Sequence, residues 1–305
     1  MIIRENIVDV EEYRLEEILN NKEVDCKPEE SIYFDLEHYV YKKPKCIGVF
    51  GACVYNKKNK KINVTQYMIE NKSEVVDILL LAKKYFIKMK REGKKVIVTF
   101  AGNNDFTVIK YLFNKYGIYF DFEKEFKSID IQKEYEKDMK ISIGLKNLEK
   151  IFEVYREGDV ISGSNLAKTF HKVLKDKEYI QRMPKEKIET ILQYNEQDVV
   201  NLYKIFINWK NYIKTEEDTK ENDDFDEIKE IKTEQIINDI KEIDNEKNIE
   251  DVKKEQENNA NDNIIIIEDQ ETKDGKMKKE NTEKFSYSGY TLEENKEIDN
   301  SETII

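Results

Sequence analysis

Two carboxylates stand two residues apart in an apolar run, SIYFDLE at residues 31–37. The run predicts a buried strand at the centre of a sheet, with Asp35 and Glu37 on one face and Phe34 and Leu36 on the other. Like charges side by side in such a place repel and resist desolvation unless a cation neutralises them. Mg²⁺ and Mn²⁺ prefer oxygen ligands of this kind. The pair therefore predicts a metal site; the alternative is a solvated strand end, which Asp-x-Glu also marks.

A third carboxylate lies on the apolar side of the last predicted helix. Pro184 suits the first turn of this helix, which is expected to run to Tyr212. Tyr194 and Asp198 are one turn apart on its apolar stripe. An aspartate on a buried helix face is costly unless something pairs with it. The alternative is an aspartate at the edge of the stripe, bonded to a neighbouring Lys or Tyr.

The elements between these residues predict an α/β fold. A hairpin with a lysine-rich loop follows the first strand. Ser73 is expected to cap the next helix, and Gly93 to lie past its end. The predicted order is strands at 45–55 and 62–69, a helix at 74–91, a strand at 95–100, a helix at 105–117, a strand at 128–131 and mainly helices to 214. This order is that of a ribonuclease H-like mixed sheet flanked by helices.

Asp105 follows the short buried strand at 95–100, after the segment AGNN at 101–104. Standing alone, it is interpreted as the N-cap of the following helix. Its place just beyond the fourth strand also makes it a possible partner of the other carboxylates at one edge of the sheet.

Together, Asp35, Glu37, Asp105 and Asp198, with Tyr194 four residues before the last, resemble the DEDD exonuclease superfamily, whose fold is ribonuclease H-like. The resemblance covers residues 32–209 and rests on FDLE at 34–37, YNEQDV at 194–199, IGLKNL at 143–148 and DVISG at 159–163. It looks most like the bacterial RNase H-like exonucleases of the tyrosine (DEDDy) subgroup. The histidine subgroup places His five residues before the last Asp, where this chain has Gln193.

The second motif departs from the family pattern. Family members carry Asn-Gly-x-x-Phe-Asp there, whereas this chain reads AGNNDF at 101–106. Ala101 replaces the usual Asn, and Asp105 is one residue closer to Gly102. After the first motif, His38 and Tyr39 replace the small hydroxyl residues of the family, which would hold the terminal nucleotide.

The resemblance implies a 3′–5′ exonuclease that hydrolyses single-stranded DNA or RNA with two Mg²⁺ or Mn²⁺ ions about 4 Å apart. Asp35 would bridge the ions, and Glu37, Asp105 and Asp198 would complete the ligand set. Tyr194 would orient the attacking water. The alternative is a non-catalytic nucleic-acid-binding or scaffold protein on the same fold, which the altered second motif favours.

Charge divides the chain of 305 residues into unequal parts. Residues 215–305 hold 30 Asp and Glu against 13 Lys and Arg, whereas residues 1–214 hold 34 against 39. We therefore expect an N-terminal extension at 1–30, a nuclease domain at 31–214 that attracts nucleic acid, and an acidic, largely disordered tail at 215–305. The alternative for the tail is self-inhibition of the basic groove, or docking of a protein partner, for which IIII at 264–267 is suited.

Cys26, Cys46 and Cys53 are odd in number and form no Cys-x-x-Cys pair. This argues for a reducing compartment and against a disulfide framework or a thiolate zinc site. The first 20 residues have no uninterrupted apolar core, and no stretch is long enough to span a membrane. A cytoplasmic protein is expected.

Overall fold

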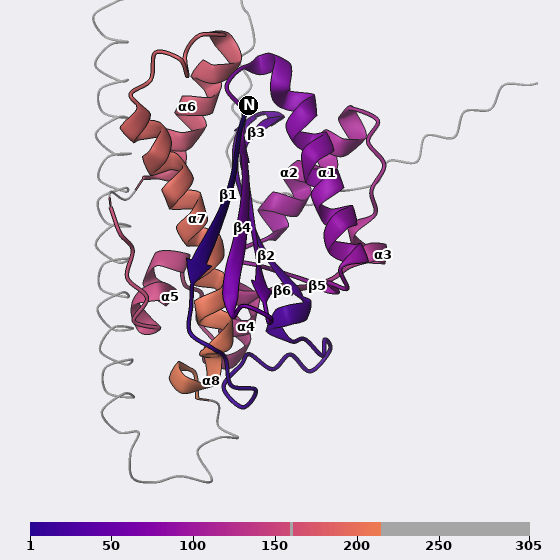
Figure 1. The fold of residues 1–305 in the computed structure, drawn as a ribbon, viewed down its shortest axis with the longest axis vertical. Helices are drawn as coiled ribbons and strands as arrows, with labels where there is room; N and C mark the ends of the chain where they lie inside the picture. Colours follow the sequence, from indigo (N-terminus) through magenta and orange to yellow (C-terminus); the bar gives the residue numbers. More distant parts are fainter. Residues whose placement is uncertain (159–160, 215–305) are drawn as a thin grey trace, which may run out of the picture. The chain divides into compact units, whose positions relative to one another are not determined.

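A mixed sheet lies at the centre of the computed structural model, which describes residues 1–158 and 161–214 (Figure 1). The strands are β1 Ile2–Asp9, β2 Ser31–Tyr41, β3 Lys43–Asn56, β4 Lys61–Met68, β5 Val96–Thr99 and β6 Lys127–Asp130. The order in the six-stranded sheet is β1-β4-β3-β2-β5-β6, with β2 antiparallel to β3 and parallel to β5. The strand that carries Asp35 and Glu37 is therefore central, as predicted.

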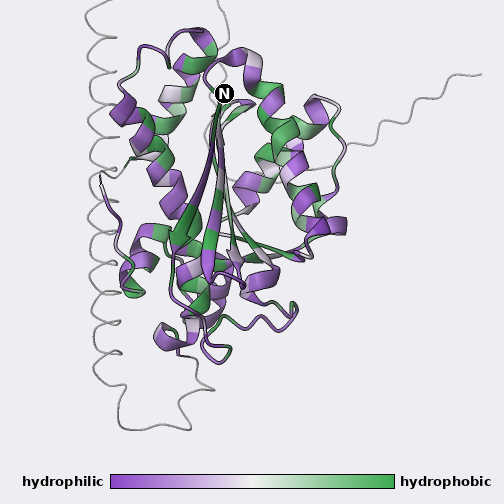
Figure 2. Cartoon of the chain, viewed as in Figure 1, coloured by the Kyte–Doolittle hydropathy of each residue, from purple (hydrophilic) through white to green (hydrophobic). Residues whose placement is uncertain are grey.

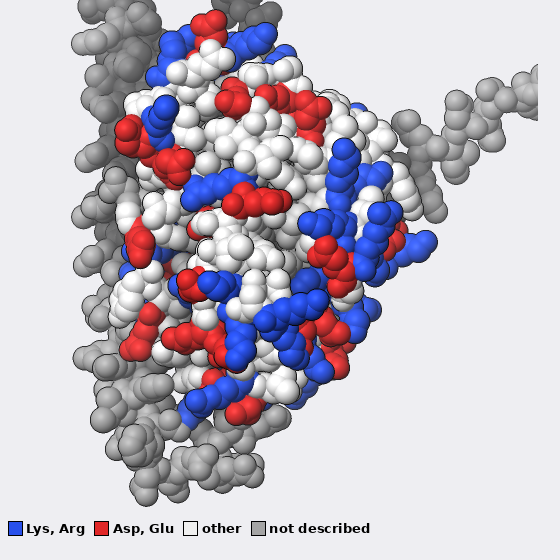
Figure 3. All heavy atoms as spheres, in the orientation of Figure 1, with Lys and Arg blue, Asp and Glu red and all other residues white. Residues whose placement is uncertain are grey.

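Helices cover both faces of this sheet. They are α1 Val75–Arg91, α2 Asn103–Lys115, α3 Phe122–Glu125, α4 Ile131–Met139, α5 Leu145–Ile151, α6 Gly163–Lys175, α7 Lys185–Ile207 and α8 Trp209–Tyr212, with short 3₁₀ turns η1 Pro28–Glu30 and η2 Lys72–Glu74. In Figure 1, α1 and α2 lie on one side of the sheet and α7 on the other. Hydrophobic residues gather in the strands and on the inner helix faces, and alternate with hydrophilic ones in β1 and β4 (Figure 2). Basic and acidic side chains are interspersed on the face shown in Figure 3.

Local sequence explains α1 and corrects its predicted cap. Its buried residues recur at intervals of three and four, from Val75 through Ile78, Leu79, Ala82 and Phe86 to Met89. That spacing forms one apolar face against the sheet. Asn71 caps the 3₁₀ turn η2 just before α1: its side chain accepts a hydrogen bond of 3.0 Å from the backbone N–H of Ser73. The N-cap of α1 itself is Glu74, whose side chain makes no cap hydrogen bond. The expectation that Ser73 caps this helix was wrong, because Ser73 lies within η2, and Glu74 takes the N-cap position of α1.

Two further elements differ from the sequence predictions. Residues 2–9, expected within an extension, form the edge strand β1 and pair with β4. Their alternating burial is the period-two signal of a half-buried strand. The last helix ends at Ile207 and is followed after Asn208 by the separate turn α8, and Pro184 stands at the N-cap of α7 rather than within its first turn. Predictions for residues 215–305, and for Asp159 and Val160, lie outside the described residues.

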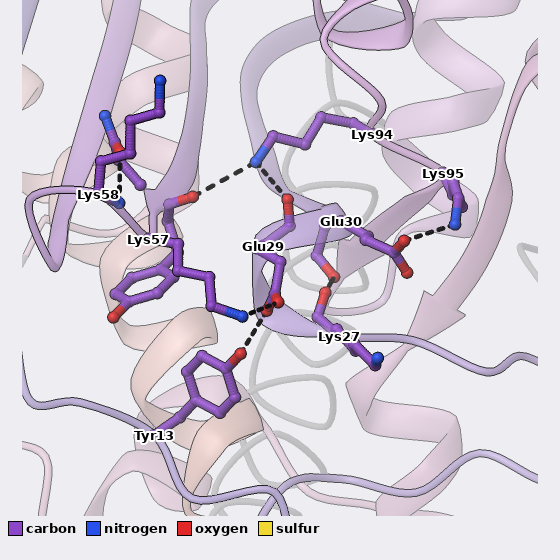
Figure 4. A network of polar contacts seen from close by, with 11 residues as sticks. Tyr13, Lys27, Glu29, Glu30, Lys57, Lys58, Lys94 and Lys95 are labelled. Carbon is purple, nitrogen blue, oxygen red and sulfur yellow. Dashed lines mark hydrogen bonds and ion pairs between the residues drawn. The ribbon is translucent and has the colours of Figure 1, made fainter.

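A polar network anchors the start of β2 (Figure 4). The Nζ of Lys94 donates to the backbone carbonyls of Glu29, at 2.7 Å, and Tyr55, at 3.4 Å. The Glu29 carboxylate accepts from Lys57 at 2.9 Å and from the hydroxyl of Tyr13. Because Lys94 is only 7% exposed, the carbonyls of Glu29 and Tyr55 accept the hydrogen bonds that its ammonium group would otherwise donate to water. The network ties η1 to the β3–β4 hairpin and so fixes the strand that carries Asp35.

In the described part of the chain, no helix combines the length and apolar character needed to cross a membrane.

Candidate metal centre

Three of the four predicted carboxylates converge where β2 meets α7. One oxygen from each of Asp35, Glu37 and Asp198 lies within 4.8 Å of the others. Glu37 is 9% exposed and Asp198 is 5% exposed. The strand period places the two β2 carboxylates on one face, and α7 crosses that face with Asp198 pointing inward. A set of three oxygens this close fits a single hard divalent cation.

Asp105 lies beside this set without joining it. It is the third residue of α2, it is 6% exposed, and its Oδ1 is 3.9 Å from Nε2 of His38. Burial lowers the pKa of His38, so the imidazole is neutral near pH 7 and does not balance the aspartate. Because His38 directly follows Glu37 in β2, this contact places Asp105 beside the strand that carries Asp35 and Glu37.

The altered second motif is held by a carboxylate of the neighbouring strand. The side chain of Asp130, at the end of β6, accepts from the backbone N–H groups of Ala101 at 2.9 Å and Gly102 at 3.1 Å. Ala101 has a φ of 51°, in the left-handed region that Asn adopts more easily than Ala. The Asn of the family pattern therefore suits this backbone, and Asp130 stabilises the same turn here with Ala in its place.

An amide on α7 fixes the orientation of Asp35. The Nδ2 of Asn195 donates to Oδ2 of Asp35 at 3.0 Å, and Oδ1 of Asn195 accepts from Nε2 of Gln66 at 2.8 Å. Gly51 lies opposite Asp35 in the sheet, and a Cβ there would stand 2.0 Å from Oδ1 of Asn195. Glycine is required at this close approach of helix to strand.

Arg156 is the resident cation of the centre, and sequence reasoning missed it. It follows α5, and its Nε and Nη2 bind Glu149 at 2.7 and 2.6 Å, while Nη2 also binds Oδ1 of Asp198. Glu149 is 2% exposed and also accepts from Nδ2 of Asn201 at 2.9 Å. No sequence pattern marked Arg156 or Glu149, because both lie in a segment rich in charged residues, LEKIFEVYREGD at 148–159.

The ring of Tyr194 is flanked by two cations. Nζ of Lys146 lies 5.4 Å, and the Cζ of Arg156 lies 5.0 Å, from the ring centre. Burial, with added repulsion from Asp198, raises the pKa of the Tyr194 phenol, so the hydroxyl keeps its proton at neutral pH. It is available there as a hydrogen-bond donor.

Electrostatics in the centre favour a bound cation. Burial raises the pKa of Asp35 to about 6, although the hydrogen bond from Asn195 opposes the shift. Burial also raises the pKa of Glu37, Asp105 and Asp198 well above the usual range, and repulsion from Asp35 adds to each shift. Arg156 and Lys146 only partly offset four carboxylates. An open hollow of about 380 Å³, lined by Asp35, Glu37, Tyr194 and Asp198 among others, gives a hydrated metal ion access. The donor set and the uncompensated charge fit Mg²⁺ or Mn²⁺.

These pKa shifts predict the pH dependence of metal binding. Because protons compete with the ion for Asp35 and for the neighbouring carboxylates, whose pKa values are also raised, we expect Mn²⁺ affinity to weaken at least about tenfold for each unit below pH 6. The stability of the metal-free protein should change in the opposite direction with pH. Because the pKa of Asp35 is higher in the folded protein, its protonated form stabilises the fold fully below pH 3.8, and this stability is lost as the pH rises through about 6. Calorimetric Mn²⁺ titrations and melting in EDTA across this range measure both. A constant Mn²⁺ affinity would contradict the prediction.

The fold and the buried carboxylate set together define the class of RNase H-like α/β domains, as the sequence predicted. A comparison with protein families matched residues 32–210 to the RNase_H superfamily. The chain therefore belongs to the RNase_H superfamily, and the predicted fold class is confirmed. No match was found among curated proteins. Membership suggests a nuclease that binds nucleic acid and uses divalent metal ions.

Proposed function

We propose that the chain is a metal-dependent 3′–5′ exonuclease of the tyrosine subgroup, acting on single-stranded DNA or RNA with two Mg²⁺ or Mn²⁺ ions. The observation that carries the proposal is the convergence of Asp35, Glu37 and Asp198, with Asp105 beside them and Tyr194 one turn from Asp198. A binding module has no need of this costly set of buried charges.

In this proposal the four carboxylates hold the ions. When bound, the ions would activate a water and stabilise charge on the leaving 3′ oxygen. Asn195 keeps the carboxylate of Asp35 oriented, and Arg156 keeps that of Asp198 oriented. Tyr194 donates its hydroxyl hydrogen bond to orient the attacking water. Its raised pKa makes it an orienting group rather than a base.

Degradation of 5′-labelled single strands of DNA and RNA, with Mn²⁺ and with Mg²⁺, tests the proposal. We expect a ladder that shortens from the 3′ end in the presence of metal and disappears with EDTA. The faster substrate identifies the sugar preference. Internal cleavage would replace the exonuclease assignment by an endonuclease. No cleavage under any condition, with strand binding retained, would favour the non-catalytic nucleic-acid-binding protein.

Tyr194→Phe separates water orientation from metal binding. Removing the hydroxyl should lower kcat about 100-fold, because a positioned group at the reacting water contributes on this scale. The affinity for Mn²⁺ should stay at the wild-type value, since the phenol is not a ligand in this proposal. Tyr119→Phe is the matched control, because Tyr119 is 79% exposed. An unchanged kcat for Tyr194→Phe would remove this tyrosine from the mechanism.

A further inference from the structure

A second open region adjoins the carboxylate centre, between α6 and the first half of α7. It consists of two hollows of about 540 and 480 Å³ that share Lys172, Tyr179 and Lys187 in their linings. We call this region the α6–α7 groove. Its walls are α6, the segment 176–184 and the first two turns of α7. The proposed hydrolysis of the scissile bond does not use it.

Two neighbouring pairs of residues link the lining of the groove to that of the centre. On α7, Lys187 and Thr190 line the groove, and Tyr194 one turn further lines the hollow of the centre. Residues at these spacings lie on one helix face. On the opposite wall, the carbonyl of Ile161 accepts from Nζ of Lys146 at 3.4 Å, and these two residues line the groove and the centre respectively. A nucleic-acid strand that leaves the centre past Tyr194 would therefore enter the groove.

Four basic side chains line the groove against two acidic ones, Asp176 and Glu186, so its net charge is opposite in sign to that of the centre. Lys172, Lys175 and Lys187 are exposed and have no carboxylate within ion-pair distance in the described ranges 1–158 and 161–214. Arg182 is also in the lining but is paired with Asp176 and Glu178. Free ammonium groups facing a shared hollow attract a polyanion, and a metal-bound carboxylate centre does not supply that attraction.

An aromatic ring lies among these cations. Tyr179 is half-buried in the groove wall, with Nζ of Lys172 5.7 Å from its ring centre. Basic side chains with an exposed aromatic face are the combination that binds single-stranded nucleic acid without sequence preference. A duplex offers no free base to such a ring. The distance from Lys187 to Tyr194 along α7 is about 10 Å, which matches about three nucleotides of a stacked strand.

We propose that the α6–α7 groove binds the phosphate backbone of the single strand on the 5′ side of the scissile bond, with Lys172 and Lys187 contacting phosphates. This inference rests on the proposed function, since the strand enters the groove from the carboxylate centre. It makes the groove the source of affinity for strands longer than about three nucleotides, and it makes that affinity sensitive to salt.

The test is strand binding by the full chain in EDTA, where no cleavage occurs. Fluorescence anisotropy gives Kd for labelled oligo-dT and oligo-U of about 4 to 12 nucleotides at several salt concentrations. In Lys172→Ala/Lys187→Ala, the slope of log K against log salt should fall by about 1.4, because each lost phosphate contact on a single strand removes about 0.7. Lys84→Ala/Lys124→Ala makes the same change in net charge on α1 and α3 and should keep the wild-type slope.

The outcomes separate the groove from the proposed function. If Lys172→Ala/Lys187→Ala binds the strand with an unchanged slope of log K against log salt, the proposal that the groove binds the strand is overturned, and the nuclease proposal is unaffected. No binding of any strand by the wild type overturns both. If strand binding is unchanged but a peptide of residues 216–230 binds the wild type and not the double variant, the groove serves the chain's own acidic segment and the proposal is overturned. Equal circular dichroism and melting of the two double variants ensure that the comparison is one of folded proteins.

Discussion

Asp35→Asn is expected to lower metal-dependent cleavage by more than about 100-fold, because Asp35 is a direct metal ligand in the proposed function. Loss of a residue that only supports a ligand typically costs up to about 100-fold, and loss of a ligand should cost more. The same change should raise the melting temperature of the metal-free protein. Asn keeps the shape of Asp and still accepts from Asn195, but it removes a buried charge whose pKa is raised to about 6. Near pH 8 the wild type carries that charge beside Glu37 and Asp198 at a cost in free energy of unfolding.

Two measurements on the same protein check this result: the cleavage rate with Mn²⁺, and melting in EDTA. The matched control is Asp77→Asn, which makes the same chemical change at an exposed position on α1. The control should leave both rate and melting temperature unchanged. Wild-type cleavage by Asp35→Asn would overturn the assignment of the centre. Loss of cleavage with a lowered melting temperature would instead show that Asp35 supports the fold.

Arg156→Met is expected to reduce the free energy of unfolding by about 3 kcal/mol or more in the absence of metal. Methionine replaces the aliphatic stem but leaves Glu149, 2% exposed, and Asp198, 5% exposed, without the guanidinium that pairs with both. A buried carboxylate that loses its partner keeps its full desolvation cost. Urea unfolding in EDTA measures the loss.

The control for this prediction is Arg182→Met, which breaks an exposed ion pair with Asp176 and should cost less than about 1 kcal/mol. Glu149→Leu introduced together with Arg156→Met should recover part of the lost free energy of unfolding, because it removes one of the two buried carboxylates that lack a cationic partner in Arg156→Met. Saturating Mn²⁺ should recover more in Arg156→Met than in the wild type, since a metal ion would then be the cation next to Asp198. Equal losses in Arg156→Met and Arg182→Met would show that the buried network contributes no more than a surface pair.

Arg156 also distinguishes this centre from a simple carboxylate cluster. Its Nη2 holds Oδ1 of Asp198, and Asn195 holds Oδ2 of Asp35, so two of the four proposed ligand carboxylates have one oxygen engaged by the protein. A carboxylate fixed in this way presents its other oxygen in a defined direction before any ion arrives. Asp35 and Asp198 are thus oriented in advance, which in the proposed function lowers the reorganisation needed for catalysis.

The sequence by itself determined those features that depend on local period and chain order. Alternation in β2 placed Asp35 and Glu37 on one face, and the four-residue interval in α7 placed Tyr194 and Asp198 on one side of a helix. The order of strands and helices defined the fold class, because strand runs and helix runs have different hydrophobic periods. The last helix was predicted beyond its true end, since the apolar stripe continues through Trp209 after the helix breaks at Asn208.

Only the tertiary structure decided which distant groups meet these residues. Arg156 lies 42 positions from Asp198, and Asn195 lies 160 positions from Asp35, so no local pattern joins them. The pairing of β1 with β4 likewise depends on how the chain packs. The period of side chains along a helix or strand follows from the backbone geometry of that element. A contact between elements, in contrast, forms only when the hydrophobic core brings them together.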